Sequence, residues 1–217
     1  MSLILYAHPF SSYCQKVLVA LWEKETAFTY RHLEEAGVRE ELASLWPIAK
    51  FPVLVDGGTT VVETSIIIEY LDLHHPGKAQ MLPDDPARML EVRLLDRFFD
   101  QYVMNAAQVA VNESLRAAPD RLEEAKQSAG QALEIAYAWL EARLDGREWA
   151  AGARFSMADC AAAPALFYGD WVHPIGDIHP RLRAYRARLL ERPSFARAVA
   201  EGRKYRSYFP LGAPDRD

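Results

Sequence analysis

The sequence predicts an α/β domain followed by an all-helical domain, and three observations carry this prediction. Short apolar runs alternate with helical patterns from residue 1 to about residue 78. Prolines then cluster between Pro76 and Pro86, and we place a linker at residues 79–86. From residue 87 to residue 217 the apolar residues recur at helical spacing, without a convincing strand pattern.

The first domain is expected to have the element order βαβ-α-ββα. Strand-like runs occupy residues 3–6, 28–33, 51–55 and 60–62. Helical spacing occupies residues 12–24, 39–45 and 64–73. The first two strands flank a helix and should therefore be parallel, with a right-handed crossover. The last two flank Asp56-Gly57-Gly58, a strong hairpin signal, and should be antiparallel.

The second domain is expected to begin with an antiparallel pair of long helices, over residues 87–115 and 120–144. Ser156 has the character of a helix cap, because Asp159 follows three residues later and can accept a hydrogen bond from the cap's N–H. Two further helices should begin at prolines, which suit a first helical turn: Pro180 and Pro193.

Composition narrows the function classes. The chain has 25 basic and 30 acidic residues, a net charge of −5, which speaks against a nucleic-acid-binding surface. Its two cysteines are too few for a secreted disulfide framework. The first basic residue is Lys16, so the positively charged start of a signal peptide is not expected. No apolar run approaches the roughly 18 residues needed to span a membrane. We therefore expect a cytoplasmic protein without a membrane or nucleic-acid partner.

The main chemical signal lies where the first strand meets the first helix, in residues 7–14 (AHPFSSYC). Backbone N–H groups and the positive helix end converge at such a turn, and both stabilise a thiolate. Thioredoxin-like domains place Cys-x-x-Cys here, whereas this chain has Ser11-x-x-Cys14, with Cys14 on the face expected to be buried. A hydroxyl at this point can hydrogen-bond the thiolate of a bound substrate. The alternative is that Ser11 or Ser12 serves only as a helix cap.

Two further sites bear on that choice. Pro52 opens a strand, which indicates an edge position or a cis peptide facing the turn, and the main chain before it would be free to bind a peptide. Glu63 and Thr64 precede a helix whose start suits an anion, while the carboxylate suits an ammonium group. Lys50 would lie near a second carboxylate of the ligand. The ligand would then have an α-amino acid at one end, a thiol-bearing peptide in the middle and a carboxylate at the far end, and glutathione fits this description.

On these residues the chain resembles the cytosolic-type glutathione transferases over essentially its whole length. Pro52 matches the family's cis-proline, and residues 63–71 (ETSIIIEYL) resemble its Glu-Ser-x-x-Ile-x-x-Tyr-Leu run. Residues 156–159 (SMAD) match the capping box that starts the core helix of the C-terminal domain. The resemblance implies a thioredoxin-like N-terminal domain that binds glutathione as co-substrate, no metal, and a homodimer. Its contacts are expected at residues 63–70 and after Met89.

The resemblance also implies roles for single residues. Ser11 falls where serine-type classes, such as zeta and theta, keep the hydroxyl that stabilises the thiolate, with Ser12 as the second candidate. Phe51 would bind the cysteinyl backbone, and Lys50 would lie near the glycyl carboxylate. The rest of the zeta signature is absent, which speaks against a maleylacetoacetate isomerase. The implied glutathione-binding residues are Ser11, Lys50, Phe51, Pro52, Glu63 and Thr64.

A pocket for an apolar electrophile is expected between the domains. We expect its walls to come from the first loop and the first long helix, at His8, Pro9, Phe10, Phe98, Phe99, Tyr102 and Asn105, with Tyr168 and Trp171 as weaker candidates. The spacing of the aromatic residues on the helix is equally typical of a core. The expected function is detoxification by glutathione transfer. The alternatives are a glutathione-dependent isomerase, dehalogenase or peroxidase, and a non-catalytic interaction protein that retains the fold.

Overall fold

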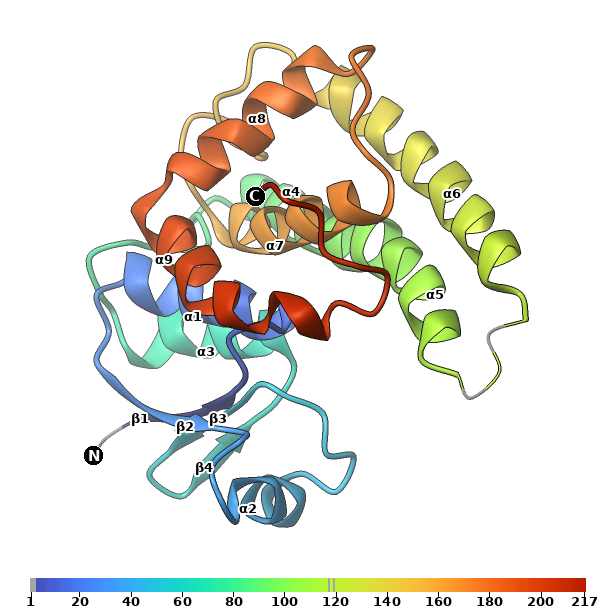
Figure 1. Ribbon diagram of the computed structural model, residues 1–217. Coiled ribbons are helices and arrows are strands. Elements are labelled where there is room, and N and C mark those ends of the chain that lie inside the picture. Colours follow the sequence, from blue (N-terminus) through green and yellow to red (C-terminus); the bar gives the residue numbers. More distant parts are fainter. Residues whose placement is uncertain (1–2, 117, 119) are drawn as a thin grey trace.

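The computed structural model describes residues 3–116, 118 and 120–217, and confirms an α/β domain followed by a helical one (Figure 1). The four strands are β1 (Leu3–Ala7), β2 (Phe28–His32), β3 (Val53–Asp56) and β4 (Thr59–Val61). They form one sheet in the order β2-β1-β3-β4. β1 and β2 are parallel, while β3 is antiparallel to both β1 and β4. The predicted crossover and hairpin are therefore both present.

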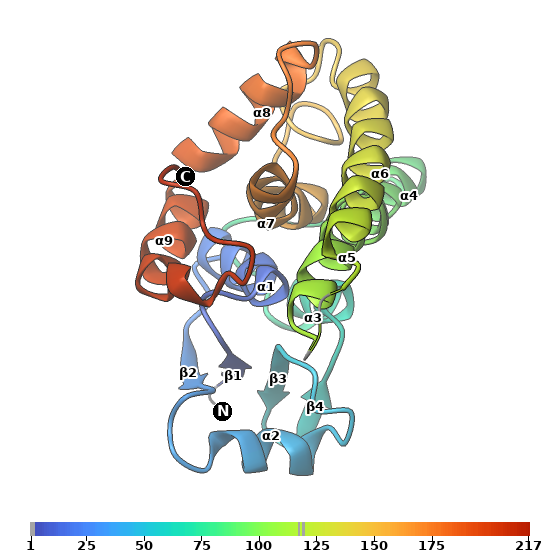
Figure 2. The same cartoon turned by 45° about the vertical axis from the view of Figure 1, so that its right-hand side comes forward.

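Helices cover both faces of the sheet. The three helices of this domain are α1 (Ser12–Glu23), α2 (Val38–Leu45) and α3 (Thr64–His74). Alternate residues of β1 point to opposite faces: Leu3 and Leu5 pack towards α1 and α3, while Tyr6 packs towards α2. Figure 2 shows α1 and α3 between the sheet and the helical domain. α1 is therefore buried on nearly all sides, from Cys14 to Leu21.

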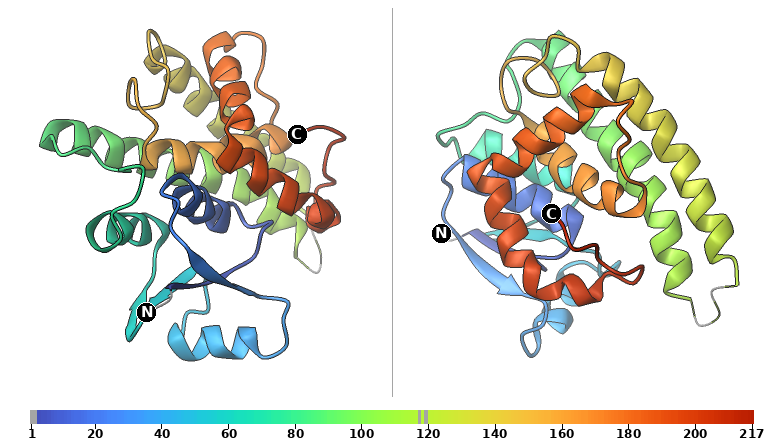
Figure 3. Two further views of the ribbon diagram at one scale, coloured as in Figure 1. Left: turned by 90° about the vertical axis from the view of Figure 1, so that its left-hand side faces the viewer. Right: turned by 45° about the horizontal axis from the view of Figure 1, so that its top comes forward.

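The helical domain surrounds α7, which is buried along almost its whole length. Its elements are α4 (Pro86–Phe98), the π-helical turn η1 (Phe99–Met104), α5 (Asn105–Ser114), α6 (Leu122–Arg143), α7 (Met157–Val172), α8 (Pro180–Glu191), α9 (Pro193–Gly202) and the 3₁₀ turn η2 (Arg203–Tyr208). α5 and α6 lie side by side (Figure 3). The helix starts expected at Ser156, Pro180 and Pro193 are confirmed. The first long helix contains an unexpected π-helical turn.

The segment between the domains is firmly attached. The Lys24 ammonium lies 2.7 Å from the Asp72 carboxylate and donates a hydrogen bond to the Ala79 carbonyl at 3.2 Å. Asp72 also accepts from the N–H groups of Met81 and Leu82, both of which are buried. The proline-rich linker is thus bonded to the domain that precedes it. In the part of the chain that the structure describes, no helix is both long and apolar enough to cross a membrane.

Candidate functional site

Ser11 caps α1 at the junction between the domains. Its backbone is extended (φ −82°, ψ 125°), and its Oγ accepts a hydrogen bond from the Cys14 N–H at 3.4 Å. An acceptor role in the cap leaves the hydroxyl's own hydrogen available for a ligand. Capping and thiolate binding by Ser11 are therefore compatible. Ser12 is the first residue of the helix and lines the same cavity.

The protein's own thiol at this turn is out of reach. Cys14 is fully buried, as the sequence predicts, and its Sγ accepts from the His8 N–H at 3.4 Å. Burial raises the pKa of Cys14 to about 12, so the thiol stays protonated at neutral pH. Cys160 is also fully buried, in the core of the helical domain. Any reactive thiolate at this turn must therefore come from a ligand.

The loop before β3 faces the turn. The Phe51–Pro52 peptide is cis, which is one of the two arrangements expected from the sequence and the one that the family resemblance implies. The pairing of β1 with β3 ends at Tyr6 opposite Val53, so Phe51 lies beyond the paired part of the strand. Phe51 and Lys50 line the same cavity as Ser11. A peptide-like ligand beside Ser11 would therefore reach this stretch of main chain.

The start of α3 has an unusual backbone. Glu63, which precedes the helix, is exposed and has a φ of 68°, a region that side-chain-bearing residues seldom occupy. Such conformations are frequent at ligand sites. Thr64 begins the helix and is almost buried, and Ser65 behind it donates a 2.5 Å hydrogen bond to Asp96.

A buried ionic cluster underlies this helix start. The Lys16 ammonium is 1% exposed and lies 2.6 Å from an Asp96 oxygen, 2.7 Å from an Asp100 oxygen and 3.1 Å from the Ser65 Oγ. Burial raises the pKa of the Asp100 carboxyl, and the charge of Lys16 opposes that rise. The cluster joins α1, α3 and the α4–η1 helix. Sequence reasoning missed it, because Lys16 shares a helix stripe with the polar Ser12 and Glu23 and nothing in the local sequence marks it as buried.

A cavity of about 460 Å³ opens beside Ser11, between the two domains. Most of its lining is apolar, and it is supplied by the turn, the loop before β3, the helices η1 and α5, α7 and the C-terminal segment. The lining residues are Phe10, Ser11, Ser12, Tyr13, Ala49, Lys50, Phe51, Met104, Ala107, Gln108, Val111, Leu115, Tyr168, Val172, Tyr208, Phe209 and Pro210. Apolar pockets with a few polar groups are typical small-molecule sites.

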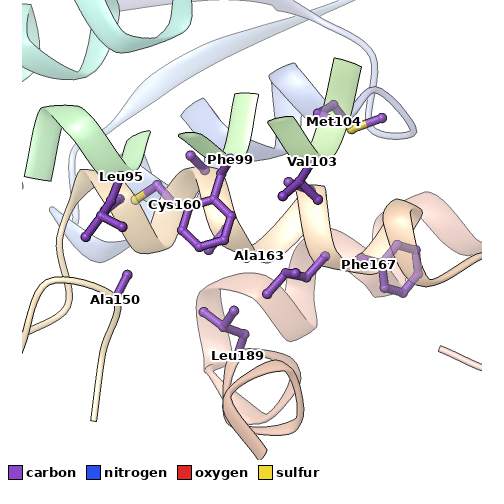
Figure 4. Close-up of a cluster of buried hydrophobic side chains, with 14 of the residues drawn as sticks. Leu95, Phe99, Val103, Met104, Ala150, Cys160, Ala163, Phe167 and Leu189 are labelled. Atoms are coloured by element: carbon purple, nitrogen blue, oxygen red, sulfur yellow. The ribbon is translucent and has the colours of Figure 1, made fainter. Parts of the chain in front are cut away.

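Several residues of the first long helix that we expected to line the cavity do not line it. Phe99 is fully buried in the core against α7, as Figure 4 shows. Tyr102 is 62% exposed and packs beside Phe98 on the outer side. Asn105 is exposed, and its side chain accepts a hydrogen bond from the Tyr13 hydroxyl at 3.0 Å. None of these helix residues is among the cavity's lining. The cavity is lined instead by Met104, Ala107, Gln108 and Val111, which share another face of the helix.

The first loop also differs from expectation. Phe10 lines the cavity, whereas His8 and Pro9 are buried behind the turn and do not. Of the two weaker candidates, Tyr168 lines the cavity and Trp171 lies outside it. The wall formed by Tyr208, Phe209 and Pro210 was not predicted, because nothing in their local sequence indicates where the chain end folds back.

Among the described residues, one group has the make-up of a metal site: His8, His32 and Glu34. Both imidazoles accept a backbone N–H at Nδ1, from Phe10 at 3.2 Å and from Glu34 at 3.1 Å. Each Nε2 therefore carries the proton in the neutral ring and has no free lone pair for a metal. Burial lowers the pKa of His8, which favours that neutral ring. The group is arranged as a hydrogen-bond cluster.

Comparison with known proteins identifies the family. The family model of the glutathione S-transferase N-terminal domain matches residues 5–79, and that of the C-terminal domain matches residues 98–193. FtsZ-localized protein A of Caulobacter vibrioides is 28% identical over 212 residues, covering 91% of this chain and 90% of that protein.

Two further relatives are similar over nearly their whole length. A probable maleylacetoacetate isomerase of Vibrio cholerae is 29% identical over 212 residues, covering 93% of this chain and 97% of that protein. The structure of a glutathione S-transferase of Methylobacillus flagellatus with GSH bound has a TM-score of 0.78 at 27% identity, covering 91% of this chain and 98% of that one. The chain described here belongs to the glutathione S-transferase family.

Proposed function

We propose that this protein is a glutathione transferase that adds the glutathione thiolate to a small apolar electrophile. One observation carries the proposal: the Ser11 hydroxyl, the main chain before the cis-proline and an apolar cavity share one opening. The structure of the Methylobacillus relative with GSH bound supports the choice of ligand. A cytoplasmic detoxification role is part of this proposal.

Glutathione would lie across the three sites already described. Its γ-glutamyl end would meet the start of α3, where Glu63 is available to the ammonium and Thr64 to the carboxylate. Its cysteinyl main chain would pair with Phe51, and its glycyl carboxylate would lie near Lys50. This pose directs the thiol towards Ser11.

The energy needed to form the thiolate is within reach of the turn. A shift of about two units from a free thiol pKa of about 8.5 corresponds to roughly 2.7 kcal/mol. A helix end supplies about 0.3–1 kcal/mol, and a hydrogen bond to a charged group about 1.5–3 kcal/mol. Together these contributions span about 1.8–4 kcal/mol, a range that includes the required energy without a general base.

We also propose a homodimer. Large apolar side chains are exposed on α4, η1 and α6, and one more lies on α3: Leu90 (65%), Leu94 (52%), Tyr102 (62%), Ile135 (74%) and Ile66 (50%). Leu90 and Leu94 are one helical turn apart on α4, and exposed apolar side chains that share a face favour an interface. Light scattering at micromolar concentration should give twice the 24.5 kDa mass of the chain. A monomer mass would reject the dimer without affecting the proposed reaction.

The likeness to FtsZ-localized protein A favours a second function, that of an interaction protein which keeps the fold without turnover. The likeness to a probable maleylacetoacetate isomerase keeps a glutathione-dependent isomerase in view, beside dehalogenase and peroxidase activities. Retention on immobilised glutathione, followed by a conjugation assay with an aryl halide, separates these functions. Retention with conjugation supports the transferase. Retention without conjugation directs the search to the other glutathione reactions, and failure of both steps with a panel of electrophiles favours the interaction protein.

A further inference from the structure

In the two peptide groups that precede Ser11, every N–H and every carbonyl makes a hydrogen bond. In the Pro9–Phe10 peptide, the carbonyl accepts from Gln15 Nε2 at 2.8 Å and the N–H donates to His8 Nδ1 at 3.2 Å. In the Phe10–Ser11 peptide, the carbonyl accepts from the Tyr168 hydroxyl at 2.8 Å and the N–H donates to the His8 carbonyl at 3.1 Å. Because a peptide group is planar, bonds at both ends fix its orientation.

One of these four bonds comes from the other domain. Tyr168 lies on α7, 158 residues after Phe10 in the chain, and its side chain is buried in the helical domain. Its ring meets the Phe10 ring edge-on, with centroids 5.5 Å apart. Its hydroxyl also accepts from Gln15 Nε2 at 3.3 Å, so it is held from both sides. Burial raises the pKa of Tyr168, which keeps the hydroxyl a donor.

Space around the turn is equally restricted. Gly202, at the end of α9, lies so close that a Cβ there would come within 3.3 Å of the Pro9 carbonyl oxygen and 3.4 Å of Gln15 Nε2. The turn therefore has helical-domain atoms against it on two sides, from α7 and from α9. Its conformation depends on that domain as well as on its own.

We propose that Tyr168 is a positioning residue for the thiolate site: through the Phe10 carbonyl it orients the peptide that carries Ser11, and so aims the Ser11 hydroxyl at the glutathione sulfur. The inference rests on the proposed function. Loss of the Tyr168 hydroxyl releases one end of the Phe10–Ser11 peptide, and the hydrogen bond from Ser11 to the thiolate weakens. Glutathione affinity changes little, because the glutamyl and glycyl ends of the tripeptide bind elsewhere.

The test compares Tyr168→Phe with Tyr137→Phe. Tyr137 is a matched control, since it is a buried tyrosine of the same domain whose hydroxyl donates to a backbone carbonyl, that of His173, at 3.1 Å, away from the turn. The absorbance of the bound thiolate is followed against pH, together with the dissociation constant for glutathione. We expect Tyr168→Phe to raise the pKa of bound glutathione by roughly half a unit to one unit. That shift lowers the thiolate fraction about three- to tenfold below the pKa.

Tyr137→Phe should leave that titration unchanged. Identical titrations of Tyr168→Phe and the wild type, or equal shifts in both variants, overturn the inference while glutathione binding stands. A wild-type protein that binds no glutathione overturns the proposed function and this inference with it. If Tyr168→Phe does not fold, Gln15→Met replaces it. That variant removes the bonds to the Pro9 carbonyl and the Tyr168 hydroxyl, and the same upward shift is expected.

Discussion

Two helices of this protein, α1 and α7, begin at a serine cap. A carboxylate of the chain lies at the start of α7, whereas a cavity lies at the start of α1. At α7, Ser156 is buried, and the third residue of the helix is Asp159. That carboxylate accepts from the Ser156 N–H at 2.9 Å, the Ala150 N–H at 2.8 Å and the Tyr185 hydroxyl at 2.6 Å. At α1 the third residue is Cys14, the first turn holds no acidic residue, and Ser11 borders a cavity.

The difference shows how one local motif serves stability in one place and binding in another. The positive end of α7 is met by an anion of the chain itself. Burial raises the pKa of the Asp159 carboxyl, and the donors that face it offset part of that rise. At α1 the third residue of the helix is Cys14, whose buried thiol is neutral. The capacity to stabilise an anion there remains available to a ligand.

Removal of the internal anion should have the largest effect. Asp159→Ala leaves the Ala150 N–H and the Tyr185 hydroxyl without their acceptor in the interior. We expect the free energy of unfolding to fall by about 3–5 kcal/mol. Urea denaturation followed by circular dichroism measures it. A loss below about 1 kcal/mol would mean that the start of α7 does not depend on its carboxylate.

Removal of the hydroxyl at α1 should act on activity. Ser11→Ala is expected to lower kcat about 10- to 100-fold, since a hydrogen bond to a charged group contributes about 1.5–3 kcal/mol. The glutathione dissociation constant should change much less. Ser12→Ala is the matched control and should retain most of the turnover. If the two variants exchange behaviour, the role passes to Ser12.

The two serines should be alike in their capping contribution. Ser156→Ala is expected to destabilise the protein by about 1 kcal/mol, and Ser11→Ala by a similar amount or less. Chemical denaturation of the two variants under the same conditions provides the comparison. A much larger loss for Ser11→Ala would indicate that its hydroxyl is primarily structural, which would weaken the transferase proposal.

The smallest effect concerns Cys14. Its pKa of about 12 in the fold lies well above that of a free thiol, so between these two values the unfolded chain releases a proton that the folded chain keeps. The stability that this thiol contributes is therefore complete below pH 9 and declines as the pH rises from 9 towards 12. At pH 8 we expect a thiol reagent to label neither cysteine until urea is added. Rapid labelling of the native protein at Cys14 would show that its thiol is accessible.

The fold could be predicted from the sequence, because strand alternation, helical spacing, caps and turns each depend on a few neighbouring residues. The position of Ser11 follows from the same patterns, since it depends only on where a strand ends and a helix begins. The cavity wall does not. Phe99 is in the core and Tyr102 faces outwards, and helical spacing alone does not say which face of a helix borders a cavity and which borders the core or solvent. Tyr208 lies at the cavity through contacts distant in sequence, since its hydroxyl donates to the Glu34 carboxylate of the first domain at 3.0 Å.

The attachment of the linker has a mechanical consequence. Lys24 and Asp72 bind its main chain, and at Gly77 a Cβ would lie only 2.3 Å from the Lys24 carbonyl oxygen. A hinge needs a few residues whose torsions can change freely, and this segment has lost that freedom. The Met157 N–H of the helical domain also donates to the Met81 carbonyl at 2.9 Å, so the same segment is bonded to both domains. The linker therefore acts as a bonded connection between the two sides of the cavity, and not as a flexible hinge.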